Sequence, residues 1–260
     1  MNASPSTPLN AAPQPGDVIL RFNGTDNYIE VPTSPDFSIS TTGELSVSAW
    51  LRPDVLDFPA AEGTGYVHWM GKGDSGEQEW TFRIYSQKNR ETPPRPNRIS
   101  FYVFNPEGGL GVGSYFQDPI VQGGWIHVVG IAGSAQTYIY KDGALRRCDT
   151  YRGPAAGGCP AHTLPDSGDQ LVINPQGGSA PLRIGTRDFG SFFQGAIRGV
   201  RIWNRAIQAD EIQTLFASDV PSQDGLVAEY LLDADTGNTA ADTAGGHNGQ
   251  IFGAVWEQQT

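Results

Sequence analysis

Short and often alternating runs of apolar residues recur along the whole chain, separated by turn residues, and this pattern constrains the fold most. The 260 residues include 33 Gly and 19 Pro, and only the segment 206–218 has the apolar spacing of an amphipathic helix. The sequence therefore predicts an all-β sandwich of two antiparallel sheets with one short helix. The predicted strands are 18–23, 28–31, 44–52, 66–72, 79–86, 98–105, 110–116, 125–132, 137–141, 170–173, 181–186, 196–204, 225–232 and 250–256.

The length suits one large domain rather than two. Residues 1–16 are rich in Pro, Ser and Ala and have neither a basic start nor an apolar centre, so we expect a flexible leader rather than a signal peptide. Residues 17–260 are predicted to form a single domain. Because no run of about 18 apolar residues occurs, we expect no insertion into a membrane.

Acidic residues outnumber basic ones by 28 to 17, which gives a formal net charge of −11. A surface this negative repels phosphate backbones and anionic lipids, so we expect neither nucleic acid nor membrane surfaces as partners unless a local basic patch outweighs the total charge. Neutral sugars, cationic ligands and divalent metals remain open.

The two cysteines, Cys148 and Cys159, are eleven positions apart in CDTYRGPAAGGC. Glycine and proline between them would let the chain turn back, and a disulfide is predicted, with two free thiols as the alternative. A disulfide favours an oxidising compartment, so the expected location is secreted or extracellular.

Several segments in this order resemble the laminin-G-like branch of the concanavalin A-like lectin/glucanase superfamily. They are LRFNGTDNYIEVP at 20–32, LSVSAWLRPD at 45–54, GGWIHVVGIAG at 123–133 and FFQGAIRGVRIWNRAIQADEI at 192–212. The resemblance implies a jelly roll, a fold that hosts lectins, adhesion domains, glycosidases and lyases. The chain has Arg198 and Gly199 where this family often has acidic residues, which weakens the expectation of calcium.

Strand parity points to a sugar-binding surface. Successive side chains alternate between faces, so Trp80, Phe82 and Ile84 should pack between the sheets, as should Ile99, Phe101 and Val103. The opposite face then carries aromatic rings and guanidinium groups, a combination that stacks on sugars and bonds to their hydroxyls. The predicted carbohydrate-binding residues are Arg83, Tyr85, Arg98 and Tyr102. The alternative is an ordinary solvated sheet face.

Calcium is a possible cofactor at the first turn, NGTDN, where the resemblance makes Asn23 and Asp26 the candidate ligands. The alternative is a turn whose side chains bond only to their own backbone. A second and poorer option is the cluster of Asp233, Asp235 and Asp242.

The expected function is non-catalytic, lectin-like binding of a polysaccharide or glycan. Two alternatives stay open. One is a polysaccharide lyase or glycoside hydrolase of the same fold, for which Glu77 and Glu79 are the candidate acid pair. The other is an adhesion or assembly domain that binds a protein partner.

Overall fold

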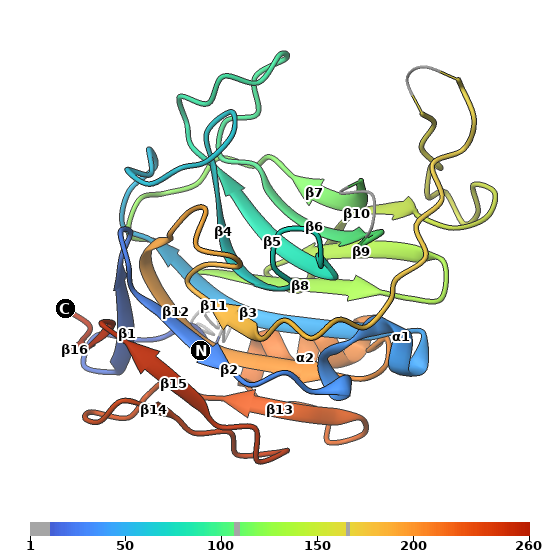
Figure 1. Ribbon diagram of the computed structural model, residues 1–260. Helices are drawn as coiled ribbons and strands as arrows, with labels where there is room; N and C mark the ends of the chain where they lie inside the picture. Colours follow the sequence, from blue (N-terminus) through green and yellow to red (C-terminus); the bar gives the residue numbers. More distant parts are fainter. Residues whose placement is uncertain (1–10, 107–109, 165–166) are drawn as a thin grey trace, which may run out of the picture.

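A computed structural model describes residues 11–106, 110–164 and 167–260. Two eight-stranded antiparallel sheets face each other, which confirms the predicted sandwich (Figure 1). In spatial order, sheet A contains β10 (Ala144–Thr150), β9 (Gln136–Lys141), β8 (Ile126–Ala132), β3 (Leu45–Pro53), β12 (Gln194–Trp203), β1 (Val18–Asn23) and β16 (Val255–Gln258), with β13 (Leu226–Tyr230) also paired to β12. Sheet B contains β14 (Thr239–Ala240), β15 (Gly249–Phe252), β2 (Tyr28–Val31), β11 (Leu182–Ile184), β4 (Tyr66–Lys72), β5 (Trp80–Tyr85), β6 (Ile99–Phe104) and β7 (Gly111–Phe116).

Two strand predictions need correction, and two observed strands, β10 and β14, are not among those predicted. Residues 170–173 form no strand; Gln170 makes an isolated bridge to Thr163, and the Leu171 and Ile173 amides donate to His162 and Tyr151 rather than to one continuous partner strand. Residues 250–256 are two strands, β15 and β16, separated by a turn at Gly253 (φ +70°). The edge strand β10 was missed because its exposed first residues, among them Leu145, lack the alternation that burial of one face imposes.

The core lies between the sheets and contains the aromatic residues that strand parity placed there. Trp80, Phe82 and Phe101 are fully buried, and the rings of Phe82 and Phe101 pack 4.9 Å apart. Gly130 on β8 faces these rings across the sandwich, where a Cβ atom would come within 2.5 Å of Phe101. The absence of a side chain at this position therefore makes room for the ring pair of sheet B.

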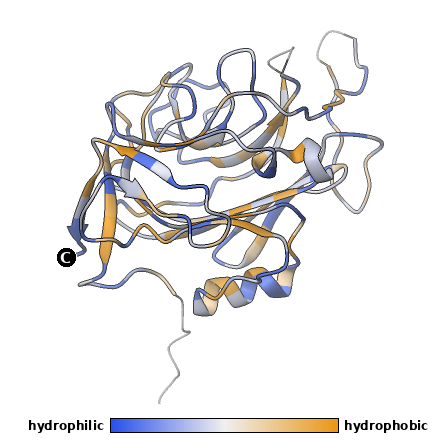
Figure 2. Cartoon of the chain, turned by 60° about the horizontal axis from the view of Figure 1, so that its bottom comes forward, coloured by the Kyte–Doolittle hydropathy of each residue, from blue (hydrophilic) through white to orange (hydrophobic). Residues whose placement is uncertain are grey.

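The predicted helix corresponds to α2 (Ala209–Ser218), which begins three residues later than expected, after a capping box between Gln208 and Glu211. Ile212 and Leu215 pack against Trp203, Val129 and Ile131, so α2 covers part of the outer face of sheet A (Figure 2). Two single turns, η1 (Pro35–Phe37) and α1 (Ile39–Thr42), precede β3. None of the described helices has the length and apolar character needed to cross a membrane.

The predicted leader falls partly outside the described residues, since 1–10 are not among them. Its end contacts the domain. The Ala11 amide donates to the Phe216 carbonyl over 3.0 Å, and the Gly16 amide donates to Gln259 over 2.8 Å.

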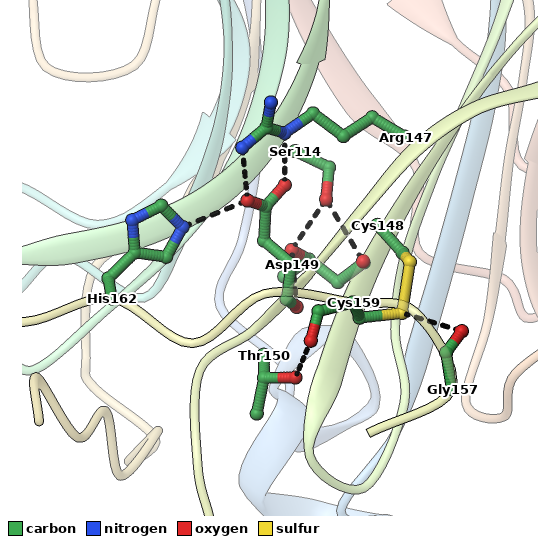
Figure 3. Close-up of a disulfide and its surroundings, with 9 residues drawn as sticks. Ser114, Arg147, Cys148, Asp149, Thr150, Gly157, Cys159 and His162 are labelled. Atoms are coloured by element: carbon green, nitrogen blue, oxygen red, sulfur yellow. Dashed lines mark hydrogen bonds and ion pairs between the residues drawn. A yellow bond between two sulfur atoms is a disulfide. The ribbon is translucent and has the colours of Figure 1, made fainter. Parts of the chain in front are cut away.

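The predicted disulfide is confirmed, since Cys148 on β10 is bonded to Cys159 in the following loop (Figure 3). The same loop is held by main-chain contacts, because the Thr150 amide donates to Pro160 and the Thr150 hydroxyl donates to Cys159.

Candidate functional site

The predicted sugar-binding residues lie on the outer face of sheet B, over β4 to β7. In the strand register Arg83 pairs with His68 on one side and Ser100 on the other, while Tyr102 pairs with Thr81. Since the flanking residues Phe82, Ile84 and Phe101 are in the core, the side chains between them point outward. We call the outward side chains of Tyr66, Arg83, Tyr85, Arg98, Tyr102 and Tyr115 the Arg–Tyr face.

Arg83 lies at the centre of this face among aromatic rings. Its guanidinium carbon is 4.7 Å from the ring centroid of Tyr66, 5.0 Å from Tyr102 and 5.5 Å from Phe104. Burial raises the pKa of Tyr66 and of Tyr102, so both phenols are neutral at neutral pH. The rings therefore hold the cation by cation–π attraction without neutralising it.

His68 fixes the orientation of Arg83. The Arg83 Nε–H donates to His68 Nε2 over 2.9 Å, and His68 Nδ1 contacts the Glu62 carboxylate. Burial, with Arg83 and Arg187 nearby, holds the pKa of His68 well below its usual value. A neutral ring that accepts at Nε2 must carry its proton on Nδ1, the nitrogen in contact with Glu62, so His68 has no lone pair left to accept a proton.

The carboxylates of Glu62 and Asp188 lie near His68, with one ligand-type atom of each within 4.8 Å of the others. These groups already have partners, because His68 is bonded to Arg83 and Glu62, and Asp188 is paired with Arg187. The two arginines would also repel a cation, so we assign no metal to this cluster.

The second arginine of the face, Arg98, stacks on Tyr115. Its guanidinium carbon is 3.8 Å from that ring centroid, and Arg147 of β10 approaches the same ring to 4.3 Å. Arg147 is anchored by a bidentate pair with the fully buried Asp149, which also bonds to His162 (Figure 3). The disulfide therefore lies directly beside the residues that position Arg147.

Tyr85 differs from the other predicted residues because it is only 2% exposed. Its hydroxyl accepts from Arg95 over 3.2 Å, so the loop between β5 and β6 covers it. Arg83, Arg98 and Tyr102 therefore reach the surface of one face, whereas Tyr85 is covered by the loop between β5 and β6.

Sequence reasoning missed Tyr115 and Arg147. Tyr115 has the outward parity on β7 and pairs with Ser100, so extending the parity argument by one strand would have found it. Arg147 comes from sheet A and reaches Tyr115, with a hydroxyl contact of 3.1 Å, where the edges of the two sheets meet. The sequence pattern does not predict such a contact between the edges of two sheets.

A buried hydroxyl without a partner and a hollow both lie at this face. The Ser100 hydroxyl, between Arg83 and Tyr115, is buried and has no hydrogen-bond partner within the described part of the chain. Buried polar groups normally have one. A hollow of about 410 Å³ adjoins the face, lined by Tyr115, Gln117 and Arg147 among others.

A second aromatic group lies farther along the same outer face and was not predicted. The ring of Tyr28 on β2 stacks on Phe252 of β15 at 4.6 Å and meets Phe189 edge-on at 5.0 Å. Phe189 is 45% exposed and has a φ of +65°, an uncommon conformation for a bulky residue. Arg183 lies 4.3 Å from its ring centroid.

The candidate calcium ligands are exposed: Asn23 is the last residue of β1, and Asp26 lies in the turn that follows. Asn23 Oδ1 already accepts the amides of Thr25, Asp26 and Asn27, and its Nδ2 donates to Asp26 over 2.8 Å. As these side chains lie, they do not offer the six to eight oxygens that calcium takes. Calcium stays a prediction, which loss of melting temperature on chelation and recovery with calcium would confirm.

The candidate acid pair is not arranged for catalysis. Glu79 is 1% exposed and bonded to Lys72 and to the Gly178 amide, whereas Glu77 is exposed and bonded to Ser179. A carboxylate held in a buried ion pair cannot reach a glycosidic bond.

Comparison of solved structures supports the fold. A putative carbohydrate binding protein from Bacteroides ovatus has a TM-score of 0.56 at 16% identity, covering 94% of this chain and 60% of that one. This chain therefore spans less than two thirds of that protein. A heptameric SAP-like pentraxin from Limulus polyphemus has a TM-score of 0.49 at 14% identity, covering 79% of this chain and 84% of the pentraxin.

Among curated proteins no sequence matches the chain. The laminin G model of the Concanavalin A-like lectin/glucanases superfamily matches residues 23–164 and 158–213, which is most of the chain. The segments that carried the resemblance lie largely within this match. The chain therefore belongs to the Concanavalin A-like lectin/glucanases superfamily.

Proposed function

We propose that this domain binds glycans on the Arg–Tyr face, as a non-catalytic recognition domain that acts outside the cell. The observation that carries the proposal is the stacking of Arg83 and Arg98 on outward tyrosine rings of one sheet. Rings offer apolar faces to sugar C–H groups, and guanidinium groups donate directed hydrogen bonds to sugar oxygens. The Bacteroides ovatus neighbour, whose name states carbohydrate binding, supports the same ligand class.

Binding without turnover is favoured by the state of the groups around Arg83. The Nε2 lone pair of neutral His68 is taken by Arg83, and the raised pKa of Tyr66 and of Tyr102 disfavours a phenolate base. A lyase or hydrolase requires a base or an acid pair at the substrate, and Glu79 is not available as one. The disulfide supports an oxidising, extracellular location.

The test is glycan binding by variants of the face. Replacing Arg98 by alanine should weaken binding about tenfold or more, since a hydrogen bond to a charged group contributes about 1.5–3 kcal/mol. Arg98 is half-buried, and within the described residues its side chain stacks on Tyr115 and donates hydrogen bonds only to the Gln117 amide oxygen, so the fold should survive. Arg83 and Tyr102 are packed more tightly, and their alanine variants should also lose stability.

The matched control is Tyr138→Ala, on sheet A, which should leave glycan affinity unchanged. Equal affinity of Arg98→Ala and the unmodified protein, with both folded, would contradict the proposed site. Incubation with the bound polymer should release no new reducing or unsaturated ends; their appearance would establish the lyase or hydrolase alternative.

A further inference from the structure

Most arginines of this protein are paired with carboxylates, but two arginines on the Arg–Tyr face are not paired in this way within the described residues. Ten of the fourteen arginines lie within 4.0 Å of a carboxylate oxygen. Among described residues, the four without such a partner are Arg83, Arg90, Arg98 and Arg152. Arg90 and Arg152 are exposed on loops, whereas Arg83 and Arg98 are half-buried on one sheet face. In a chain with a net charge of −11, two adjacent half-buried cations without counter-charges are unusual.

The neighbours of these two cations do not neutralise them. Arg83 is bonded to the neutral His68, and Arg98 is bonded to the amide oxygen of Gln117. Burial and the nearby Arg95 lower the pKa of Arg98, the direction expected for a cation that is desolvated beside a like charge. Tyr66 and Tyr102, the tyrosines beside Arg83, are neutral because burial raises their pKa. The positive charge is therefore held in place by rings and neutral acceptors.

Arg83 and Arg98 occupy neighbouring positions on the face, so one oligosaccharide can reach both. Arg83 pairs with Ser100, and Arg98 is two residues before Ser100, immediately ahead of β6, so the two positions are diagonal neighbours. The offset along the strand is roughly 7 Å. The buried Ser100 hydroxyl lies between them without a partner.

We infer that the Arg–Tyr face selects anionic glycans, in which carboxylate or sulfate groups occupy Arg83 and Arg98. This inference rests on the proposed function. The planar guanidinium fork matches the oxygens of a carboxylate or sulfate in a bidentate geometry, and such charge-assisted bonds are about twice as strong as neutral ones. A neutral sugar would leave both cations half-buried and without a counter-charge, which is a free-energy cost that an anionic sugar removes.

The experiment uses the whole chain on an array of uronate, sialylated and sulfated oligosaccharides, each printed beside its carboxyl-reduced or desulfated counterpart. We expect at least one anionic glycan to bind about tenfold or more tightly than its neutral counterpart, the ratio that 1.4 kcal/mol produces. For that pair, Arg98→Gln should remove most of the preference for the anion while changing affinity for the neutral form little. Arg83→Gln should act in the same direction, with its fold checked by thermal melting.

The matched control is Arg152→Gln, which makes the same change in net charge on an exposed loop and should leave the preference intact. Equal binding of anionic glycans and their neutral counterparts would overturn the inference and leave the proposed function standing. If Arg98→Gln lowered the affinity for the anionic glycan and for its neutral counterpart equally, the inference would also be overturned and the proposed function would stand. Absence of binding to every glycan on the array would overturn the proposed function and the inference together.

Discussion

Replacing Glu79 by glutamine should lower the free energy of unfolding by about 3–5 kcal/mol, the usual cost of removing one partner of a buried ion pair. The Glu79 carboxylate contacts Lys72 Nζ, and the two side chains are 1% and 0% exposed. The pair also holds the segment before β11, because Lys72 donates to the Gly178 carbonyl and Glu79 accepts from the Gly178 amide. Glutamine would leave the ammonium group buried without a counter-charge. Denaturant unfolding followed by tryptophan fluorescence measures the change.

Glu77→Gln is the matched control, since this carboxylate is exposed and its replacement should change stability by no more than about 0.5 kcal/mol. Adding Lys72→Met to Glu79→Gln should recover much of the loss, because the unpaired charge is then removed. A loss in Glu79→Gln as small as that in Glu77→Gln would show that the carboxylate contributes little. In that case the Glu79 carboxylate would again be a candidate for the catalytic acid pair.

The sequence predicted the strands whose burial imposes a pattern. Phe82 and Phe101 are core residues flanked by outward Arg83 and Tyr102, so a period of two identifies both the strands and their faces. Edge strand β10 lacks this pattern because both of its sides are partly exposed. The same argument explains why residues 170–173 were wrongly predicted, since an apolar run without a pairing partner satisfies the pattern but forms no ladder.

The candidate site was predicted only in part because its contacts join distant segments. Parity placed Arg83 and Arg98 on one face, but the stacking of Arg147 on Tyr115 depends on how β10 of sheet A meets β7 of sheet B. The contact between His68 and Glu62 depends on a loop that precedes β4. The exposed Phe189 has a left-handed backbone conformation, which no local sequence pattern predicts.

Replacing both Cys148 and Cys159 by serine should lower the free energy of unfolding by about 3 kcal/mol, the entropic estimate for a short closed loop. For a domain of this size the corresponding fall in melting temperature is about 6–12 °C. The disulfide closes a loop between cysteines that are 11 positions apart. His162 follows this loop in the sequence and bonds to Asp149 over 2.8 Å (Figure 3). Asp149 in turn anchors Arg147 against Tyr115.

The disulfide should therefore affect glycan binding less than it affects stability. Below the lowered melting temperature, the Arg147–Asp149 pair and the hydrogen bonds of Thr150 still connect β10 to its loop, so affinity should fall no more than a few-fold. Reductant should lower the melting temperature of the unmodified protein toward that of the double serine variant and leave the variant unchanged. A variant that melts at the original temperature would show that the loop is already ordered by its main-chain contacts. A large loss of affinity in a folded double serine variant would instead show that the loop after β10 is part of the binding site. In that variant only the position of the loop relative to Arg147 would have changed.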